Sequence, residues 1–487
     1  MPAAESPNGE ARRHSPGASL AEWMDLQRQL SAAAMLQSIS AVHLVRERPA
    51  FGQTIRPAKG SVLASPTIAS YDPDPDYFFH WLRDSAIVID AVRTLIEDGA
   101  DGSGAVDRVR DFVRFSLALS DLDGRALLGR GAVGAAVNPD FQQYVRSDGE
   151  LGEAAGENIL GETRFNPDGT LDIIKWARPQ HDGPALRALA VMRLWRLGVF
   201  DDAEIHDAAR RLLEADLAFT HRHRNDPSFD IWEEQIGHHY YTRLVQLAAL
   251  CDGADWMDET GDSRRAHAYR AASREIARRL DAHWDAAKGF YVSRIGAAGA
   301  TPEKELDVAA ILAVNHAARK DGAHSALDPK AQATLARLER LFRADYPINQ
   351  SAPRDRGAAM GRYAGDRYYS GGAYYFATLG AAEFFFRLAA ALAGRARTDD
   401  AAQDLAALLG AAQPRDRSGV VDALMSRGDS FMATVRGYTP AAGELSEQFD
   451  RSTGRQTSSK NLAWSHAALI TAVASRRAAC RAIDRGG

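Results

Sequence analysis

The chain has 487 residues, of which 45% are hydrophobic and 25% charged, so it can bury a large core without disulfide or metal support. Its net charge of −5 excludes an overall positive field for nucleic acid, and the absence of a run of 18 or more apolar residues predicts no membrane span. Cys251 and Cys480 are too few for a disulfide framework and lack zinc-site spacing, so two buried free thiols are predicted.

Residues 1–18 are rich in Pro, Ser, Gly and Arg and have no apolar core, which predicts a disordered tail rather than a signal peptide. This composition favours a cytoplasmic chain over one exported by a signal already removed. Helical patterning starts at Ser19, which forms a capping-box signature with Glu22 and precedes an apolar face that includes Trp23. We therefore predict a single folded domain over residues 19–487, with no linker inside it.

Twelve further helical runs follow the first helix along the chain. They are predicted at 79–97, 104–121, 184–198, 201–220, 237–253, 261–284, 305–318, 329–344, 372–395, 399–411, 418–434 and 461–479. Strand-like alternation is nearly absent, and its clearest instance is the short stretch 289–294.

Six of the connections between these helices are long and rich in Gly, Pro, Asp and aromatic residues. They cover 51–78, 122–183, 221–236, 285–304, 345–371 and 435–460. Loops of more than about 15 residues are uncommon unless they are functional, and these recur after roughly every second helix. We therefore predict an all-α fold, an (α/α)6 barrel or six-hairpin toroid, with the active site in the long loops at one end. An α-solenoid also consists of helix pairs, but no repeat of fixed period is visible.

The first chemically informative segment is Pro75–Asp84, where the chain enters a helix. It combines Tyr77, Trp81 and two further aromatic residues with the adjacent pair Arg83 and Asp84. Aromatic rings can stack on the C–H faces of sugars, while carboxylates and guanidinium groups bind sugar hydroxyls. Read alone, the segment also fits a packed helix start with a local ion pair.

The second segment is Phe229–Glu234, in which Trp232 precedes the adjacent carboxylates Glu233 and Glu234. An apolar neighbour and a like charge both raise a carboxyl pKa, as a general acid near neutral pH requires. The segment also fits an exposed acidic helix start, which the helix dipole favours. A third segment, Gly443–Asp450, holds a second candidate carboxylate in the loop before the last helix, although it also fits an ordinary loop.

Two more segments, 175–184 and 361–369, each combine arginine with aromatic and turn residues. By contrast, Gly129–Gly134 matches a dinucleotide fingerprint without the preceding strand or the following helix, so it is interpreted as a flexible loop. No HExxH helix occurs, which argues against a metal site, and no G-x-S-x-G elbow occurs, which argues against an α/β-hydrolase.

Taken together, these segments resemble the glucoamylases, the family 15 glycoside hydrolases, and in particular their single-domain fungal type. The resemblance extends over about 19–477 and rests on six motifs in the family's order. They are Ala64–Pro66 with Pro75–Ser85, Ala177–Arg187, Asp230–Glu234, Gly361–Gly371, Ser446–Asp450 and Leu462–Leu469. The resemblance implies an (α/α)6 catalytic domain that removes β-D-glucose from the non-reducing ends of α-1,4-linked gluco-oligosaccharides or starch, without a cofactor.

Carried over motif by motif, the resemblance implies that Glu233 is the general acid and Glu447 the general base that activates water. Glu444 lies outside the motif. The remaining matched positions are substrate-binding residues around the first two sugar units: Tyr77, Trp81, Arg83, Asp84, Trp176, Arg178, Trp232, Glu234, Arg362 and Trp464. Inversion of configuration predicts that the two catalytic carboxyl groups lie roughly 6.5–9.5 Å apart, with room for one water.

The chain departs from the family's motifs at His181, where the family has arginine, and at Ala373–Tyr374, where it has Pro-Trp. These changes leave open α-1,6-glucan or trehalose hydrolysis by the same fold. The sequence also leaves open a sugar-binding protein without catalysis and a sugar isomerase, although the presence of both acidic residues argues against the former. Soluble oligosaccharides are expected as substrates rather than raw starch granules, because no starch-binding module follows the last helix. A monomer without nucleic-acid or membrane partners is also expected.

Overall fold

The computed structural model describes residues 13–15, 17–69, 73–99, 104–128, 136–353, 355–369, 371–394, 405–410, 414 and 416–486. Most of the predicted tail, the Gly129–Gly134 segment and much of the predicted helix 399–411 lie outside these residues. At the tail's inner end, the His14 ring bonds to Oε1 of Gln27 over 2.7 Å.

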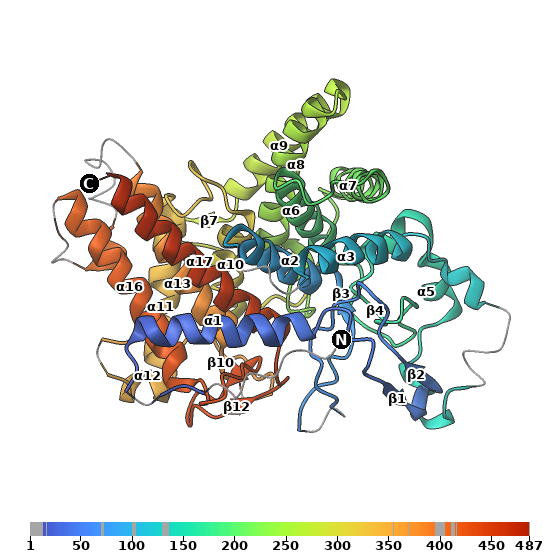
Figure 1. Cartoon of the computed structure of the whole chain (residues 1–487), viewed down its shortest axis with the longest axis horizontal. Coiled ribbons are helices and arrows are strands. Elements are labelled where there is room, and N and C mark those ends of the chain that lie inside the picture. Colours follow the sequence, from blue (N-terminus) through green and yellow to red (C-terminus); the bar gives the residue numbers. More distant parts are fainter. Residues whose placement is uncertain are drawn as a thin grey trace.

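Twelve long helices in the described part of the chain, all labelled in Figure 1, are arranged by their contacts as an inner and an outer ring. The inner ring consists of α2 (Leu82–Glu97), α6 (Asp182–Arg196), α8 (Tyr240–Glu259), α10 (Ala309–Ala317), α13 (Tyr375–Ala393) and α17 (Ala463–Gly486). The outer ring consists of α1 (Leu20–Gln37), α3 (Ala105–Leu119), α7 (Ala203–Arg222), α9 (Ser263–Asp281), α11 (Pro329–Asp345) and α16 (Arg417–Tyr438). Short helices α5 (Asp148–Glu153), α12 (Pro347–Ser351) and α15 (Ala406–Leu409) lie in the connections.

The inner helices close into a ring. In chain order, each one packs against the next, from α2 to α17, and α17 packs back against α2. Since the two rings alternate along the chain, the prediction of an (α/α)6 barrel is confirmed. The burial of the helices matches their place in the rings. The inner helix α13 is buried along most of its length, whereas the outer helix α9 exposes a row of arginines.

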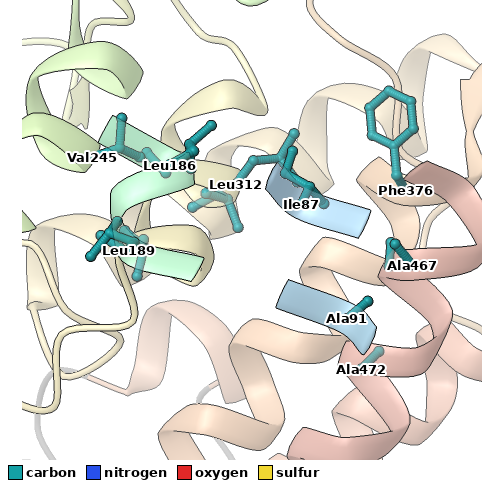
Figure 2. Packing of buried hydrophobic residues seen from close by; sticks show 14 of the residues in the cluster. Ile87, Ala91, Leu186, Leu189, Val245, Leu312, Phe376, Ala467 and Ala472 are labelled. Atoms are coloured by element: carbon teal, nitrogen blue, oxygen red, sulfur yellow. The ribbon is translucent and has the colours of Figure 1, made fainter. Parts of the chain in front are cut away.

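Apolar side chains from facing inner helices meet near the barrel axis, where they also line a cavity that is described below. Ile87 of α2, Leu186 of α6 and Leu312 of α10 extend toward one another, with Phe376 of α13 nearby (Figure 2). Burial of each such side chain stabilises the fold by roughly 1.5–3 kcal/mol. By length and composition α13 is long and apolar enough to cross a membrane, but 83% of that stretch is buried inside the structure.

The long connections all lead into the N-terminal ends of inner helices and are tied together by small antiparallel sheets. These sheets are β1 (Arg46–Arg48) with β2 (Gln53–Ile55); β3 (His80–Trp81) with β4 (Arg164–Phe165); β5 (Ser228–Phe229), β6 (Ile236–His239) and β9 (Arg294–Ile295); β7 (Trp284–Asp285) with β8 (Phe290–Tyr291); and β10 (Ala373–Tyr374), β11 (Gln448–Phe449) and β12 (Gln456–Thr457). Loops from different helix pairs are thereby held at one end of the barrel.

Three predicted helices begin three residues too early, at 79, 237 and 372, because β3, β6 and β10 directly precede α2, α8 and α13. These strands are too short to show alternation in the sequence. Cys251 and Cys480 are free, as predicted, but each is half-buried rather than fully buried.

Candidate active site

A pocket of about 270 Å³ lies where the N-terminal ends of the inner helices meet the long connections. Of the twelve predicted site residues, all except Arg178 line it. They are Tyr77, Trp81, Arg83, Asp84, Trp176, Trp232, Glu233, Glu234, Arg362, Glu447 and Trp464. The structure therefore brings together residues from five different connections, which are up to several hundred positions apart in the sequence.

Glu233 is placed by the tight loop between β5 and β6. Both backbone N–H groups that flank it, those of Trp232 and Glu234, donate to Oδ1 of Asp230, at 3.1 and 2.9 Å. The Glu233 backbone has a φ of +62°, a conformation that costs a residue with a side chain about 1–3 kcal/mol. Such strain is typical of functional sites, and here it directs the Glu233 carboxyl group into the pocket.

Three donors hold the Glu233 carboxyl group. The Trp81 indole N–H and the Arg83 guanidinium donate to its Oε1, at 2.8 and 2.9 Å, and the Trp176 indole N–H donates to its Oε2. Because Trp81 and Arg83 are almost fully buried, these contacts fix the orientation of the carboxyl group at the base of the pocket.

Arg83 lies at the centre of a cluster of acidic side chains. It forms ion pairs with Glu233 and with Asp84, the latter at 3.2 Å, and lies 3.8 Å from Asp182. It also donates to Oε1 of Gln180 over 3.1 Å. Burial raises the pKa of Asp84, and the adjacent guanidinium only partly offsets this. Arg83 therefore holds the proposed acid in place, a role that the motif alone did not predict.

Glu447 lies across the pocket, directly before β11. The β11–β12 hairpin places Ser458 beside it, and the Ser458 hydroxyl donates to its Oε2. The Tyr77 hydroxyl donates to its Oε1 over 3.4 Å and contacts the Tyr368 hydroxyl at 2.8 Å. Burial raises the pKa of Glu447 to about 7, although the Ser458 hydrogen bond opposes the effect. A carboxylate with a pKa near neutrality suits a general base.

Glu234 points into a different network from its neighbour Glu233. Arg362 and Lys304 form ion pairs with it at 3.0 and 2.5 Å, and the Tyr363 hydroxyl donates to both of its oxygens. Burial opposes ionisation, but these partners outweigh it and lower the pKa of Glu234. The expectation from the sequence, that an apolar neighbour and a like charge raise a carboxyl pKa in this segment, therefore does not hold for Glu234, whose pKa is lowered. Across the pocket, the carboxyl group of Glu447 has a raised pKa.

Stacked aromatic rings form the pocket floor. Phe376 stacks on Trp464 with ring centres 4.3 Å apart, and Trp232 stacks on Phe376 at 6.2 Å. The Trp232 indole N–H donates to the buried Asp307 over 2.8 Å, which fixes the ring from behind. The combination of aromatic rings with charged groups in one pocket suits a sugar ring, which has apolar faces and polar edges.

Arg178 does not reach this pocket. Its guanidinium donates to Glu162 and Asp172, and it lines a neighbouring cavity. Conversely, sequence analysis missed Ser458, Tyr368 and Lys304 as partners of site residues. Tyr368 lay within a motif that was singled out, whereas Ser458 and Lys304 carried no signal, because their partners are distant in the sequence.

A larger cavity of about 410 Å³, which we call the axial cavity, lies between five of the inner helices, α2, α6, α10, α13 and α17. It touches the pocket only at Phe376 and Trp464 and contains neither Glu233 nor Glu447. The acidic residues that line the axial cavity, Asp90, Glu97, Asp98 and Glu383, are all ion-paired with arginines. The smaller pocket is therefore the better candidate for acid–base chemistry.

Comparison with known proteins gives a consistent result. The sequence model of the family described as "Glycosyl hydrolases family 15" matches residues 43–119 and 137–474. "Glucoamylase 1" of Rhizopus oryzae is 27% identical over an alignment of 474 residues, which covers 93% of this chain and 70% of that protein. "Probable glucoamylase" of Schizosaccharomyces pombe is 28% identical over 97% of this chain and 94% of its own length. The solved structure of Hormoconis resinae glucoamylase superposes with a TM-score of 0.71 at 26% identity, and covers 94% of this chain and 74% of its own.

Proposed function

Because this chain belongs to glycosyl hydrolase family 15 and is thus a glycoside hydrolase, we propose that it is a glucoamylase that releases β-D-glucose from the non-reducing ends of α-1,4-linked gluco-oligosaccharides. Its substrate is an α-glucan, and residues 19–487 act as one catalytic domain. The α-1,4 linkage is proposed from the names of the relatives, which are glucoamylases.

One observation carries the proposal: Glu233 and Glu447 line the same pocket from different connections, among aromatic rings that suit a sugar. The two carboxyl groups have separate partners, since three nitrogen donors hold Glu233 whereas hydroxyl groups hold Glu447. Two carboxyl groups in distinct environments are what glycoside hydrolysis requires, one to donate a proton and one to accept it.

In the proposed reaction, Glu233 donates its proton to the glycosidic oxygen as the bond to the anomeric carbon breaks. Glu447 accepts a proton from water, and the water oxygen bonds to the opposite face of that carbon. The sugar leaves as β-glucose, and the shortened chain leaves with a new hydroxyl group. This single displacement requires a space between the carboxyl groups that holds one water.

The remaining pocket residues bind the substrate. Arg83 and Asp84 face the first sugar at the closed end of the pocket, and Trp81 and Tyr77 contact that sugar. Glu234 and Arg362, with Trp176 and Trp232, bind the second sugar nearer the mouth. A pocket closed by the Phe376–Trp464 stack admits only a chain end, which supports the release of single glucose units.

The test is to incubate the protein with maltotriose and to follow the anomeric proton signals of the fresh product by NMR. We expect early β-glucose from the wild type, and its loss in Glu233→Gln and Glu447→Gln. Glu444→Gln is the matched control, since Glu444 is an exposed carboxylate in the same connection as Glu447. Early α-glucose would contradict inversion, and full activity in either variant would contradict the assigned role of that residue.

A panel of maltose, isomaltose and trehalose at equal concentration determines the linkage. The proposal expects glucose release to be fastest from maltose. Faster release from isomaltose or trehalose would replace the α-1,4 assignment while leaving the two carboxyl roles intact.

A further inference from the structure

The axial cavity, which has no part in the proposed reaction, extends along the inside of the barrel and has a volume of about 410 Å³. Its lining follows α17 from Trp464, near the start of the helix, to Arg481, near its end, which is about 25 Å in an α-helix. The exposed residues Glu97, Ala478 and Arg481 line its outer end. At its inner end the stacked rings of Phe376 and Trp464 separate it from the active-site pocket. The axial cavity therefore faces solvent at the end of the barrel opposite to the pocket.

The inner half of the axial cavity is apolar. The side chains that line it there are labelled in Figure 2 and include Ile87, Leu186, Leu189, Leu312 and Phe376. A cavity with such a lining stays dry and binds an apolar ring once it reaches about 150 Å³. The axial cavity is therefore large enough for one apolar ring together with a polar group.

The outer half of the axial cavity carries charges that already neutralise one another. Asp90 forms ion pairs with Arg93 and Arg193, at 2.7 and 2.8 Å, and Glu383 forms one with Arg387 at 2.7 Å. A charged ligand would have to compete with these ion pairs for its partners, so the lining favours a neutral ligand. A hydroxyl group both donates and accepts hydrogen bonds, and it can therefore contact carboxylate and guanidinium groups without separating them.

Asn315 provides an acceptor for such a hydroxyl group, one turn beyond Leu312 on α10. The residue lines the cavity and is 2% exposed, and its Nδ2 donates to the Gly380 carbonyl over 2.8 Å. Its Oδ1 has no hydrogen-bond partner among the described residues. A buried acceptor is unfavourable unless a donor reaches it. The adjacent ring of His316 adds no charge, because burial lowers its pKa to about 3.

From these observations we infer that the axial cavity is a second binding site, which takes a small neutral alcohol with an apolar ring. The ring lies in the inner half against Phe376 and Trp464, and the hydroxyl group donates to Oδ1 of Asn315. The ligand enters from the end of the barrel opposite to the active-site pocket. Because neither Glu233 nor Glu447 lines the axial cavity, binding there requires no catalysis.

The test is an NMR titration of the full chain with three probes of similar shape, benzyl alcohol, toluene and benzoate, at neutral pH. We expect benzyl alcohol to bind about five-fold more tightly than the other two, because only this probe donates to Oδ1 of Asn315 without adding a charge. Equal or tighter binding of toluene overturns the assigned hydrogen bond. Tighter binding of benzoate, which Arg481 at the outer end would favour, overturns the assignment of a neutral ligand.

Variants on α17 and α10 place the binding in the axial cavity. Ala468→Leu and Ala474→Leu add side-chain volume to its lining, and Asn315→Ala removes the acceptor, while none of the three residues lines the active-site pocket. We expect each leucine variant to weaken benzyl alcohol binding about ten-fold, and Asn315→Ala to abolish the preference for benzyl alcohol over toluene. Ala482→Leu is the matched control, because it adds the same side chain to the same helix at a half-buried position that does not line the cavity. Unchanged binding in both leucine variants of the lining overturns the inference.

A competition experiment distinguishes the axial cavity from the active-site pocket, whose aromatic rings are the alternative site for benzyl alcohol. In the Glu233→Gln variant, saturating maltose occupies the pocket without turnover. We expect benzyl alcohol to bind this complex with the same affinity, within about two-fold, as it binds the maltose-free variant. Displacement of benzyl alcohol by maltose overturns the inference. If maltose itself does not bind, the proposed function fails instead, and the leucine variants of the lining still decide whether the axial cavity binds the alcohol.

Discussion

Ser458→Ala removes the hydroxyl group that donates to Oε2 of Glu447, and its effect can be worked out from the structure. Burial raises the pKa of Glu447 to about 7 in spite of this hydrogen bond. A hydrogen bond to a charged group contributes about 1.5–3 kcal/mol, and one pKa unit corresponds to about 1.4 kcal/mol. Because the hydroxyl stabilises the ionised form, its removal should raise the pKa of Glu447 by about one to two units.

The sign of the activity change follows from the proposed role. A general base works only when ionised, so kcat/KM of the wild type should fall as the pH decreases through about 7. In Ser458→Ala the fall should begin at a pH about one to two units higher. At pH values below both pKa values, kcat/KM of the variant should therefore be at least about ten-fold lower than that of the wild type. At higher pH the kcat/KM values of the two proteins should become equal.

The assay is glucose release from maltotriose between pH 4 and about 9, with kcat/KM plotted against pH. Ser459→Ala is the control, because it removes a neighbouring buried hydroxyl that does not contact the Glu447 carboxyl group. If the acidic side of the pH profile of kcat/KM is the same in Ser458→Ala as in the wild type, the argument that Ser458 sets the ionisation of Glu447 is refuted. A shift confined to the alkaline limb would show instead that Glu447 acts as the acid.

Three further predictions concern the frame of the site. Trp81→Phe removes one of the three donors to the proposed acid, and kcat should fall about 10- to 100-fold at unchanged thermal stability, as seen by steady-state kinetics and calorimetry. Asp216→Ala leaves the fully buried Arg187 without its partner, so denaturant titration should show a loss of about 3–5 kcal/mol in the free energy of unfolding. In Gly361→Ala the added Cβ would lie 1.9 Å from the Tyr346 hydroxyl, so the melting temperature should fall and KM should rise. Unchanged values of both quantities would contradict the close packing.

Much of the fold could be predicted because helix periodicity is a local signal. The twelve long helices were expected near their observed positions, and their alternation with long connections indicated a closed double ring. The errors in the predicted helix starts have a local cause as well. The segments of β3, β6 and β10 were included in three predicted helices, which therefore began three residues too early. Strands of two to four residues show too little alternation to be recognised in a sequence.

Most residues of the candidate site could be predicted as well, but from motifs rather than from periodicity. Motifs such as Phe229–Glu234 specify which residue types occur together, and the pocket contains almost all of them. The motif around Arg178 was an exception, because an ion pair with Glu162 turns that side chain away from the pocket. Ser458 could not be predicted, because a serine that follows a two-residue strand carries no signal of its own.

The sequence by itself therefore determined the helices, their pairing into hairpins and the set of residues at the active site. Only the tertiary structure decided how their charges interact. The sequence placed Glu234 next to Glu233, but folding pairs Glu234 with Arg362 and Lys304, and it is Glu447 that burial makes hard to ionise. The physical reason is that periodicity depends on neighbours along the chain, whereas a pKa depends on solvent and on charges within a few ångströms in space, which come from residues that the sequence keeps far apart.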